Sequence, residues 1–190
     1  DYARLVQGAE ARGLVGLAPR RGGWWFEQGA LVAAGRWCRH ALATPGVMFR
    51  GATEAASLAR RDGEWCVLDT AGRMLAQAPV LIVASAADAP RLAGLAHAPV
   101  AAVRGRISLL ADEDLRGLRA GLAGDGYAVR APDGWVGVGA SYERGTADVP
   151  AERVHAGNLQ RLARLLADPP AVLPVGFYAG TRAVSRDRLP

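Results

Sequence analysis

The sequence predicts an α+β protein in which a mixed, largely antiparallel sheet carries flanking helices. Short apolar runs are separated by the turn signals RDGE, TAG and PDG, and this pattern is typical of antiparallel strands joined by tight connections. Residues 150–168 instead repeat apolar side chains at helical spacing. A hydrophobic content of 51% over 190 residues is sufficient for a substantial core.

The first half of the chain predicts one helix and a series of strands. Residues 31–42 place apolar side chains on one helical face, and Pro45 and Gly46 end the helix. Strand-like runs follow at 47–52, 55–75 and 79–85. Turn signals inside the second run indicate a β-meander, and the uninterrupted apolar run PVLIVAS indicates that the meander leads into a buried strand.

The second half predicts a strand at 101–110, a short helix or loop at 112–123, and a hairpin over 126–142 that turns at residues 132–134. The helix over 150–168 is the clearest element, because its apolar residues line one side and Pro150 lies near its start. That side comprises Val154, Leu159, Leu162, Leu165 and Leu166. A strand followed by a polar turn is expected after residue 175.

All 23 basic residues are arginines, and the formal net charge is +5. A guanidinium group binds phosphate and carboxylate groups in a two-pronged geometry that an ammonium group cannot match. The charge is therefore compatible with a nucleic-acid partner, although it does not establish one.

Several other classes of protein are disfavoured. The longest apolar run, APVLIVASAADAP, is shorter than the roughly 20 residues that span a bilayer, and the first residues lack a secretory pattern, so a cytoplasmic protein is expected. No metal site is expected, because His40, His97 and His155 are isolated from one another. Cys38 and Cys66 form no CxxC pattern and are expected to be two buried free thiols.

The stretch VGVGASYERGTADV, residues 136–149, combines a strand pattern with glycines and ends in charged residues. Glycine inside a strand marks a bulge or the close approach of a backbone or a ligand. Ser141, Tyr142, Glu143 and Arg144 then lie at the end of the strand. The stretch is therefore either a simple hairpin end or the mouth of a binding site.

Five blocks of the sequence, taken in order, carry a resemblance to one family. They are GGWW, VLIVASAADAP, VRGRISLL, GYAVRAPDGWVGVGASYERGTAD and AGTRAVSRDRLP. Together they resemble the FAD-dependent oxidoreductases of the D-amino-acid oxidase and glycine oxidase superfamily. Within it they most resemble the C-terminal oxidoreductase domain of the bifunctional MnmC enzymes, which complete 5-methylaminomethyl-2-thiouridine at the wobble position of tRNA.

The resemblance implies a division of the chain between two domains. Residues 1–45 and 93–182 would belong to the substrate domain, 46–92 to the FAD-binding domain, and 183–190 would return toward the latter. The family's FAD fingerprint would lie upstream of residue 1, so we expect an internal fragment that does not retain FAD by itself. The implied partners are tRNA and a fused methyltransferase domain.

The resemblance also implies site residues. Arg182 would hold the substrate carboxylate, Tyr127 and Tyr142 would face the substrate pocket, and Arg104 would have either an active-site or a structural role. Ala55 would lie where the backbone meets the adenine ring. Ala84, Ser85 and Ala86 stand where the family has Ala-Asn-Gly, a change that implies altered flavin contacts or a degenerate enzyme.

The flavin would do the chemistry, so no catalytic side chain is assigned. Each role has a structural alternative, namely an ion pair with Asp187 for Arg182 and simple packing for the two tyrosines. Glu143 and Arg144 are expected at the rim of the pocket. The reaction would be oxidative removal of the carboxymethyl group from 5-carboxymethylaminomethyl-2-thiouridine. The alternatives are a free amino-acid oxidase and a non-catalytic domain that positions tRNA.

Overall fold

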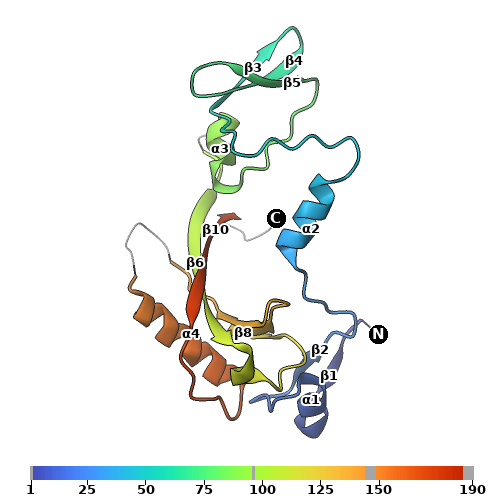
Figure 1. Ribbon diagram of the computed structural model, residues 1–190, viewed down its shortest axis with the longest axis vertical. Helices are drawn as coiled ribbons and strands as arrows, with labels where there is room; N and C mark the ends of the chain where they lie inside the picture. The colour runs from blue at the N-terminus through green and yellow to red at the C-terminus, as the bar shows by residue number, and fades with distance from the viewer. Residues whose placement is uncertain (1, 96, 144–148, 186–190) are drawn as a thin grey trace. The chain divides into compact units, whose positions relative to one another are not determined.

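The computed structural model describes residues 2–95, 97–143 and 149–185, and the chain divides into two compact units. The first unit comprises residues 1–38 and 104–181, and the second comprises residues 39–103 and 182–190. The boundaries between the units fall inside α2 (Ala34–Leu42), β6 (Val100–Ala111) and β10 (Gly176–Ser185). Figure 1 shows the elements in chain order by colour.

A five-stranded sheet forms the centre of the first unit, with the strand order β10-β6-β9-β8-β7. β9 (Trp135–Gly139) pairs antiparallel with β6 and with β8 (Gly126–Arg130), and β8 pairs antiparallel with β7 (Leu122–Gly124). The predicted strand at 101–110 and the hairpin over 126–142 are therefore confirmed. The loop or helix expected at 112–123 is the short 3-10 helix η2 (Asp112–Leu115) followed by β7.

α4 (Ala151–Leu165) covers one face of this sheet and contacts β7, β8 and β9 (Figure 1). It confirms the helix predicted over 150–168. The amphipathic pattern has its expected consequence, because the apolar side of α4 meets the inward side chains of the sheet in one core. The buried core residues are Val15, Leu110, Leu115, Leu118, Ala128, Val136, Val138, Leu162 and Leu166.

A smaller layer precedes the sheet in the first unit. β1 (Arg4–Val6) pairs antiparallel with β2 (Gly23–Trp25), and α1 (Gly8–Val15) lies between them in sequence. Gly16 ends α1 with a φ of 84°, and a Cβ at this position would lie 1.9 Å from the carbonyl oxygen of Gly117. Only glycine fits there, both for its left-handed backbone and for the close approach.

The second unit contains the predicted β-meander, formed by β3 (Ser57–Arg61), β4 (Glu64–Leu68) and β5 (Met74–Ala78). Asp62 and Gly63 connect β3 to β4 with φ values of 51° and 83°. Two positive φ values in a two-residue connection are what a type I′ hairpin turn requires, and Asp-Gly is a favoured pair there. The 3-10 helix η1 (Ala86–Asp88) and α3 (Ala89–Leu92) complete the unit.

Two of the predicted strands are wrong. Residues 47–52 and 79–85 have no strand geometry, and Val80 and Ile82 are 74% and 84% exposed instead of buried. Within the described residues neither run pairs with a strand. An apolar run enters a sheet only where a neighbouring strand satisfies its backbone groups, so hydrophobicity alone misled the prediction.

The helix predicted from residue 31 begins at Ala34, and one of the two cysteine predictions is wrong. Cys38 lies on this helix and is exposed, whereas Cys66 is buried in the central strand of the meander. The reason is that α2 buries none of its side chains, and Trp37 on the same helix is 67% exposed.

Candidate substrate and cofactor sites

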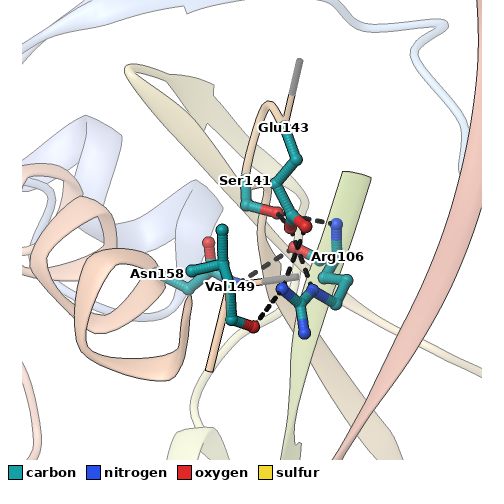
Figure 2. Close-up of polar contacts among 5 residues, drawn as sticks. All are labelled: Arg106, Ser141, Glu143, Val149 and Asn158. Carbon is teal, nitrogen blue, oxygen red and sulfur yellow. Dashed lines mark hydrogen bonds and ion pairs between the residues drawn. The ribbon is translucent and has the colours of Figure 1, made fainter. Parts of the chain in front are cut away.

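A buried ion pair joins Arg106 on β6 to Glu143, four residues after the end of β9 (Figure 2). The two side chains are 4% and 8% exposed. The guanidinium Nε and Nη2 donate to Oε1 and Oε2 of the carboxylate, each over 2.9 Å. Parallel hydrogen bonds between these planar groups give the strongest and most directional form of ion pair.

Three neighbouring groups complete this network (Figure 2). Arg106 Nη2 also donates to the carbonyl oxygen of Val149 over 2.5 Å. The Ser141 hydroxyl donates to Glu143 Oε1 over 2.5 Å and accepts from the backbone N–H of Arg106 over 2.9 Å. Asn158 on α4 donates through Nδ2 to the carbonyl oxygen of Arg106 over 3.1 Å. The network therefore fixes the chain after β9 to both β6 and α4.

The hydrogen bonds from Arg106 lower the pKa of the Glu143 carboxyl below its usual value. Burial opposes this shift, while the Ser141 hydroxyl and the charge of Arg104 support it. Glu143 is thus an anion at neutral pH, held by its partners and unsuited to donate a proton. The Phe177 ring, 5.9 Å from Arg106 Cζ, adds a cation–π contact on the guanidinium.

The small residues of the stretch 136–149 serve strand packing. Gly139 is buried, and a Cβ at this position would lie 2.9 Å from Ile107 Cγ2 on β6. The close approach is therefore that of a neighbouring strand. Glu143 was expected at a pocket rim, and this expectation is wrong because its side chain turns inward to Arg106. Arg144 lies outside the described residues.

The two tyrosines predicted to face the substrate lie on the same face of the sheet. Ala128 is part of the core beneath α4, so alternation along β8 places Tyr127 on the opposite face. Ser141 and Glu143 both face Arg106, so Tyr142 between them also points away from α4, and it is 57% exposed.

Arg104 lies beside the chain segment that carries Tyr142. Its backbone exchanges hydrogen bonds of 3.2 and 2.8 Å with Glu143, next to the end of β9. Because Arg104 is two residues from Arg106, its side chain lies on the side of β6 that carries the buried ion pair, and it is exposed. Its charge acts on Glu143, and the role of Arg104 stays a prediction.

Arg182 is an exposed residue of β10 and belongs to the second unit. It is four residues from Tyr178, so the two side chains fall on the same side of this strand. The ion-pair alternative for Arg182 names Asp187, which lies outside the described residues. The role of Arg182 stays a prediction.

The residues predicted to meet the cofactor cluster within the second unit. Ala84, Ser85 and Ala86 are exposed, and Ser85 precedes η1. Arg91 on α3 donates through Nη1 to the carbonyl oxygen of Ala56 over 3.0 Å, and its Nε and Nη2 bind Asp88. Arg91 therefore ties the segment that contains Ala55 to the helical turn that follows residues 84–86.

Ala86 has a φ of 52°, in the left-handed region that favours glycine. Its side chain is small and exposed, so a ligand can reach the backbone of this turn. A reachable backbone and small side chains are what a nucleotide cofactor needs for close approach. The residues at 84–86 thus fit contact with a cofactor.

Two negative findings apply to the described part of the chain. No group of three or more His, Cys, Asp or Glu side chains there is arranged to hold a metal ion. None of the helices described is long and apolar enough to span a membrane.

The family description "FAD dependent oxidoreductase" matches this chain over residues 1–190. The chain belongs to the FAD-dependent oxidoreductase family. This agrees with the antiparallel sheet and flanking helices of the first unit. The resemblance inferred from the five sequence blocks is confirmed at the level of the family.

Relatives within this oxidoreductase family include proteins named tRNA 5-methylaminomethyl-2-thiouridine biosynthesis bifunctional protein MnmC. The one from Paraburkholderia phytofirmans is 38% identical over 200 residues, and the one from Burkholderia multivorans is 42% identical over 198 residues. Both alignments cover 100% of this chain and 30% of the relative. The chain thus spans about 30% of the length of these relatives.

Solved structures of oxidoreductases have the same fold. The glycine oxidase from Geobacillus kaustophilus superimposes with a TM-score of 0.79 at 24% identity, covering 99% of this chain and 53% of that one. The iminodiacetate oxidase from Chelativorans superimposes with a TM-score of 0.71 at 24% identity, covering 97% of this chain and 52% of that one. These similarities confirm the predicted fold class of this family member.

Sequence analysis missed the network around Arg106 and Glu143. A signal was present in the alternation along β6. Arg106, Ser108 and Leu110 are every second residue of this strand, so all three face α4. A charged side chain on the buried face of a strand requires an opposite charge. Its partner is 37 residues away in sequence, and no local pattern identifies a partner at that distance.

Proposed function

We propose that this chain is the substrate-binding portion, with part of the FAD-binding portion, of an enzyme that acts on tRNA. The reaction is oxidative removal of the carboxymethyl group from 5-carboxymethylaminomethyl-2-thiouridine. The observation that carries the proposal is the similarity of the entire chain, at 38% and 42% identity, to relatives named for biosynthesis of the methylaminomethyl nucleoside. Membership of the FAD-dependent oxidoreductase family supports the type of chemistry.

FAD, when bound, would supply the two-electron oxidation of the bond between the secondary amine and the carboxymethyl carbon, and addition of water to the oxidised bond would release glyoxylate and leave an aminomethyl uridine. The residues of this chain orient the substrate and exclude water. Arg182 holds the carboxylate in a two-pronged geometry. Tyr127 and Tyr142, on the sheet face opposite α4, contact the modified base. The Arg106–Glu143 network fixes the chain on which Tyr142 lies.

The residues that would hold FAD are Ala55 and the turn formed by Ala84, Ser85 and Ala86. These residues offer backbone groups and no bulky side chains, so they suit the adenosine portion of the cofactor. The word bifunctional in the relatives' name and the 30% coverage support a second domain in the longer protein. We propose that this domain is a methyltransferase, which would methylate the aminomethyl group that the oxidation leaves. We place the reaction in the cytoplasm, together with tRNA.

The role of Arg182 is tested by replacing it with methionine in the longer, flavin-containing protein that we propose contains this chain. Arg182→Met should leave the flavin absorbance unchanged and lower turnover of the carboxymethylaminomethyl nucleoside in tRNA by roughly 30-fold to several thousand-fold, because the carboxylate loses its charged partner. Arg182→Lys should recover only part of the activity. Arg116→Met, at an exposed position in the first unit, is the matched control.

Near-normal turnover by Arg182→Met, together with a lower melting temperature, would assign Arg182 a structural role. The carboxylate would then need another partner, with Arg104 and Tyr127 the next residues to replace.

A further inference from the structure

The first unit contains a pocket of about 670 Å³ that includes none of the four predicted substrate residues. It lies between β2, α1, β7 and the end of α4. A volume of this size is in the usual range of about 300–1,000 Å³ for small-molecule sites. The residues used below are Arg20, Arg21, Trp24, Asp125 and Arg164, all of which line it.

The pocket carries positive charge, and one of its guanidinium groups is held in place by the protein. Arg20 Nε donates to the carbonyl oxygens of Ala163 and Leu166, over 3.1 and 3.2 Å, at the C-terminal end of α4. Among the described residues its two terminal nitrogens have no hydrogen-bond partner, so the guanidinium is held in place with two groups available for an anion. Arg164 is paired with Asp125, whereas Arg21 is exposed and forms no ion pair within the described residues. An anion is therefore the preferred occupant.

An aromatic surface lies beside these arginines. Trp24 is 68% exposed although it lies on a paired strand and lines the pocket. Because Trp24 lines the pocket, its exposed ring offers a planar apolar surface to an occupant. An aromatic face next to guanidinium groups is the arrangement that binds single-stranded nucleic acid, because bases stack on the ring and phosphates bind the arginines.

We propose that this pocket binds one nucleotide of a single-stranded RNA segment, with its base stacked on Trp24 and its phosphate on Arg20 and Arg21. The inference rests on the proposed function, since that function provides an RNA substrate with an unpaired anticodon loop. It adds an anchoring site outside the residues predicted to meet the reacting base.

The test measures binding of a fluorescein-labelled anticodon stem-loop RNA to the chain of residues 1–190, by fluorescence anisotropy at several salt concentrations. Trp24→Ala should weaken binding by about 5-fold to 100-fold, and Trp24→Phe should retain most of it, because stacking needs a ring and not an indole. Arg21→Ala should lower the slope of log K against log salt by about 0.7, as expected for one lost phosphate contact with single-stranded RNA. Arg21 is used because Arg20→Ala would also loosen the end of α4.

Trp135→Ala and Arg116→Ala are the matched controls, since both residues are exposed in the first unit and neither lines the pocket. They should bind RNA as the unaltered chain does. If the unaltered chain binds and Trp24→Ala and Arg21→Ala bind equally well, the pocket assignment is wrong while the proposed function stands. If the unaltered chain does not bind the stem-loop even at low salt, the pocket assignment is wrong, and the proposed function is decided separately by the nucleoside composition of tRNA from cells that lack the protein.

Discussion

At the scale of single residues, Glu143 determines the geometry of the chain after β9. Its carboxylate receives hydrogen bonds from Arg106 and Ser141, and Arg106 in turn reaches Val149. Each group is satisfied only while the others stay in place, so the network acts as a unit. Tyr142 lies within this segment, and its orientation depends on the pair.

Replacing one partner of this pair should be costly. Glu143→Gln leaves the Arg106 guanidinium buried with no opposite charge, and we expect a loss of about 3 to 5 kcal/mol in the free energy of unfolding, measured by urea denaturation. Glu113→Gln, at an exposed position on η2, should change this free energy by less than about 0.5 kcal/mol. A loss below about 1 kcal/mol for Glu143→Gln would show that the pair is not essential to the fold.

The lowered pKa of Glu143 predicts an acid dependence of stability. The pKa of Glu143 in the folded protein lies below the value of about 4.3 in the unfolded chain. Its contribution to the free energy of unfolding is therefore complete above about pH 4.3 and is lost as the pH falls through the pKa of the folded state. Urea denaturation from pH 7 to pH 2 should therefore show a stability difference between the unaltered chain and Glu143→Gln that is constant near neutral pH and shrinks below about pH 4. A difference independent of pH would contradict the ion pair.

Ala86 offers a test of backbone strain at the cofactor turn. Its left-handed φ of 52° costs the folded state roughly 1 to 2 kcal/mol for a residue with a Cβ. Glycine removes this cost, but its greater backbone freedom stabilises the unfolded chain by about 0.4 to 1 kcal/mol. Ala86→Gly should therefore raise the free energy of unfolding by up to about 1 kcal/mol. Ala87→Gly, one position later in η1, should instead lower it by roughly 0.5 to 1 kcal/mol. Equal losses for both variants would show that residue 86 is not strained.

At the scale of elements, α4 connects the core to the polar network. Leu162 packs in the core beneath the sheet, and Asn158 on the same helix binds the backbone of Arg106. One helix therefore supports both the stability of the sheet and the position of the strand end. The terminal carbonyl groups of α4 in turn hold Arg20 at the pocket proposed for RNA.

The contribution of α4 can be measured by truncating a core side chain. Leu162 is 1% exposed, so Leu162→Ala should lower the free energy of unfolding by about 2 to 5 kcal/mol through lost burial and the cavity that remains. Leu173→Ala, at a position that is 84% exposed, should change it by less than about 0.5 kcal/mol. Similar values for the two variants in chemical denaturation would contradict the packing of α4 on the sheet.

Local patterns predicted some elements and not others. α4 and the β8–β9 hairpin were predicted because helical periodicity and the PDG turn are encoded within each element. The run 79–85 was mispredicted because strand formation depends on a distant partner, and the Arg106–Glu143 pair was missed for the same reason. The tyrosine face could be proposed only through family resemblance, since no chemical motif marks it.

At the scale of the whole molecule, the two units differ in how many apolar side chains they bury. The apolar core cluster lies entirely in the first unit, whereas Cys66 and Val103 are the buried apolar residues of the second unit within the described range. Hydrogen exchange followed by mass spectrometry should therefore show slow exchange in β8, β9 and α4 and faster exchange in residues 39–56 and 79–85. Uniform protection across both units would contradict this difference.

The central claim is that the enzyme containing this chain removes a carboxymethyl group from a tRNA nucleoside. The most direct measurement is the nucleoside composition of tRNA, by liquid chromatography and mass spectrometry, from host cells that lack the protein. The account predicts that 5-carboxymethylaminomethyl-2-thiouridine accumulates, that the unaltered gene removes it, and that the Arg182→Met gene does not. Unchanged nucleoside composition in the deletion strain would contradict the claim.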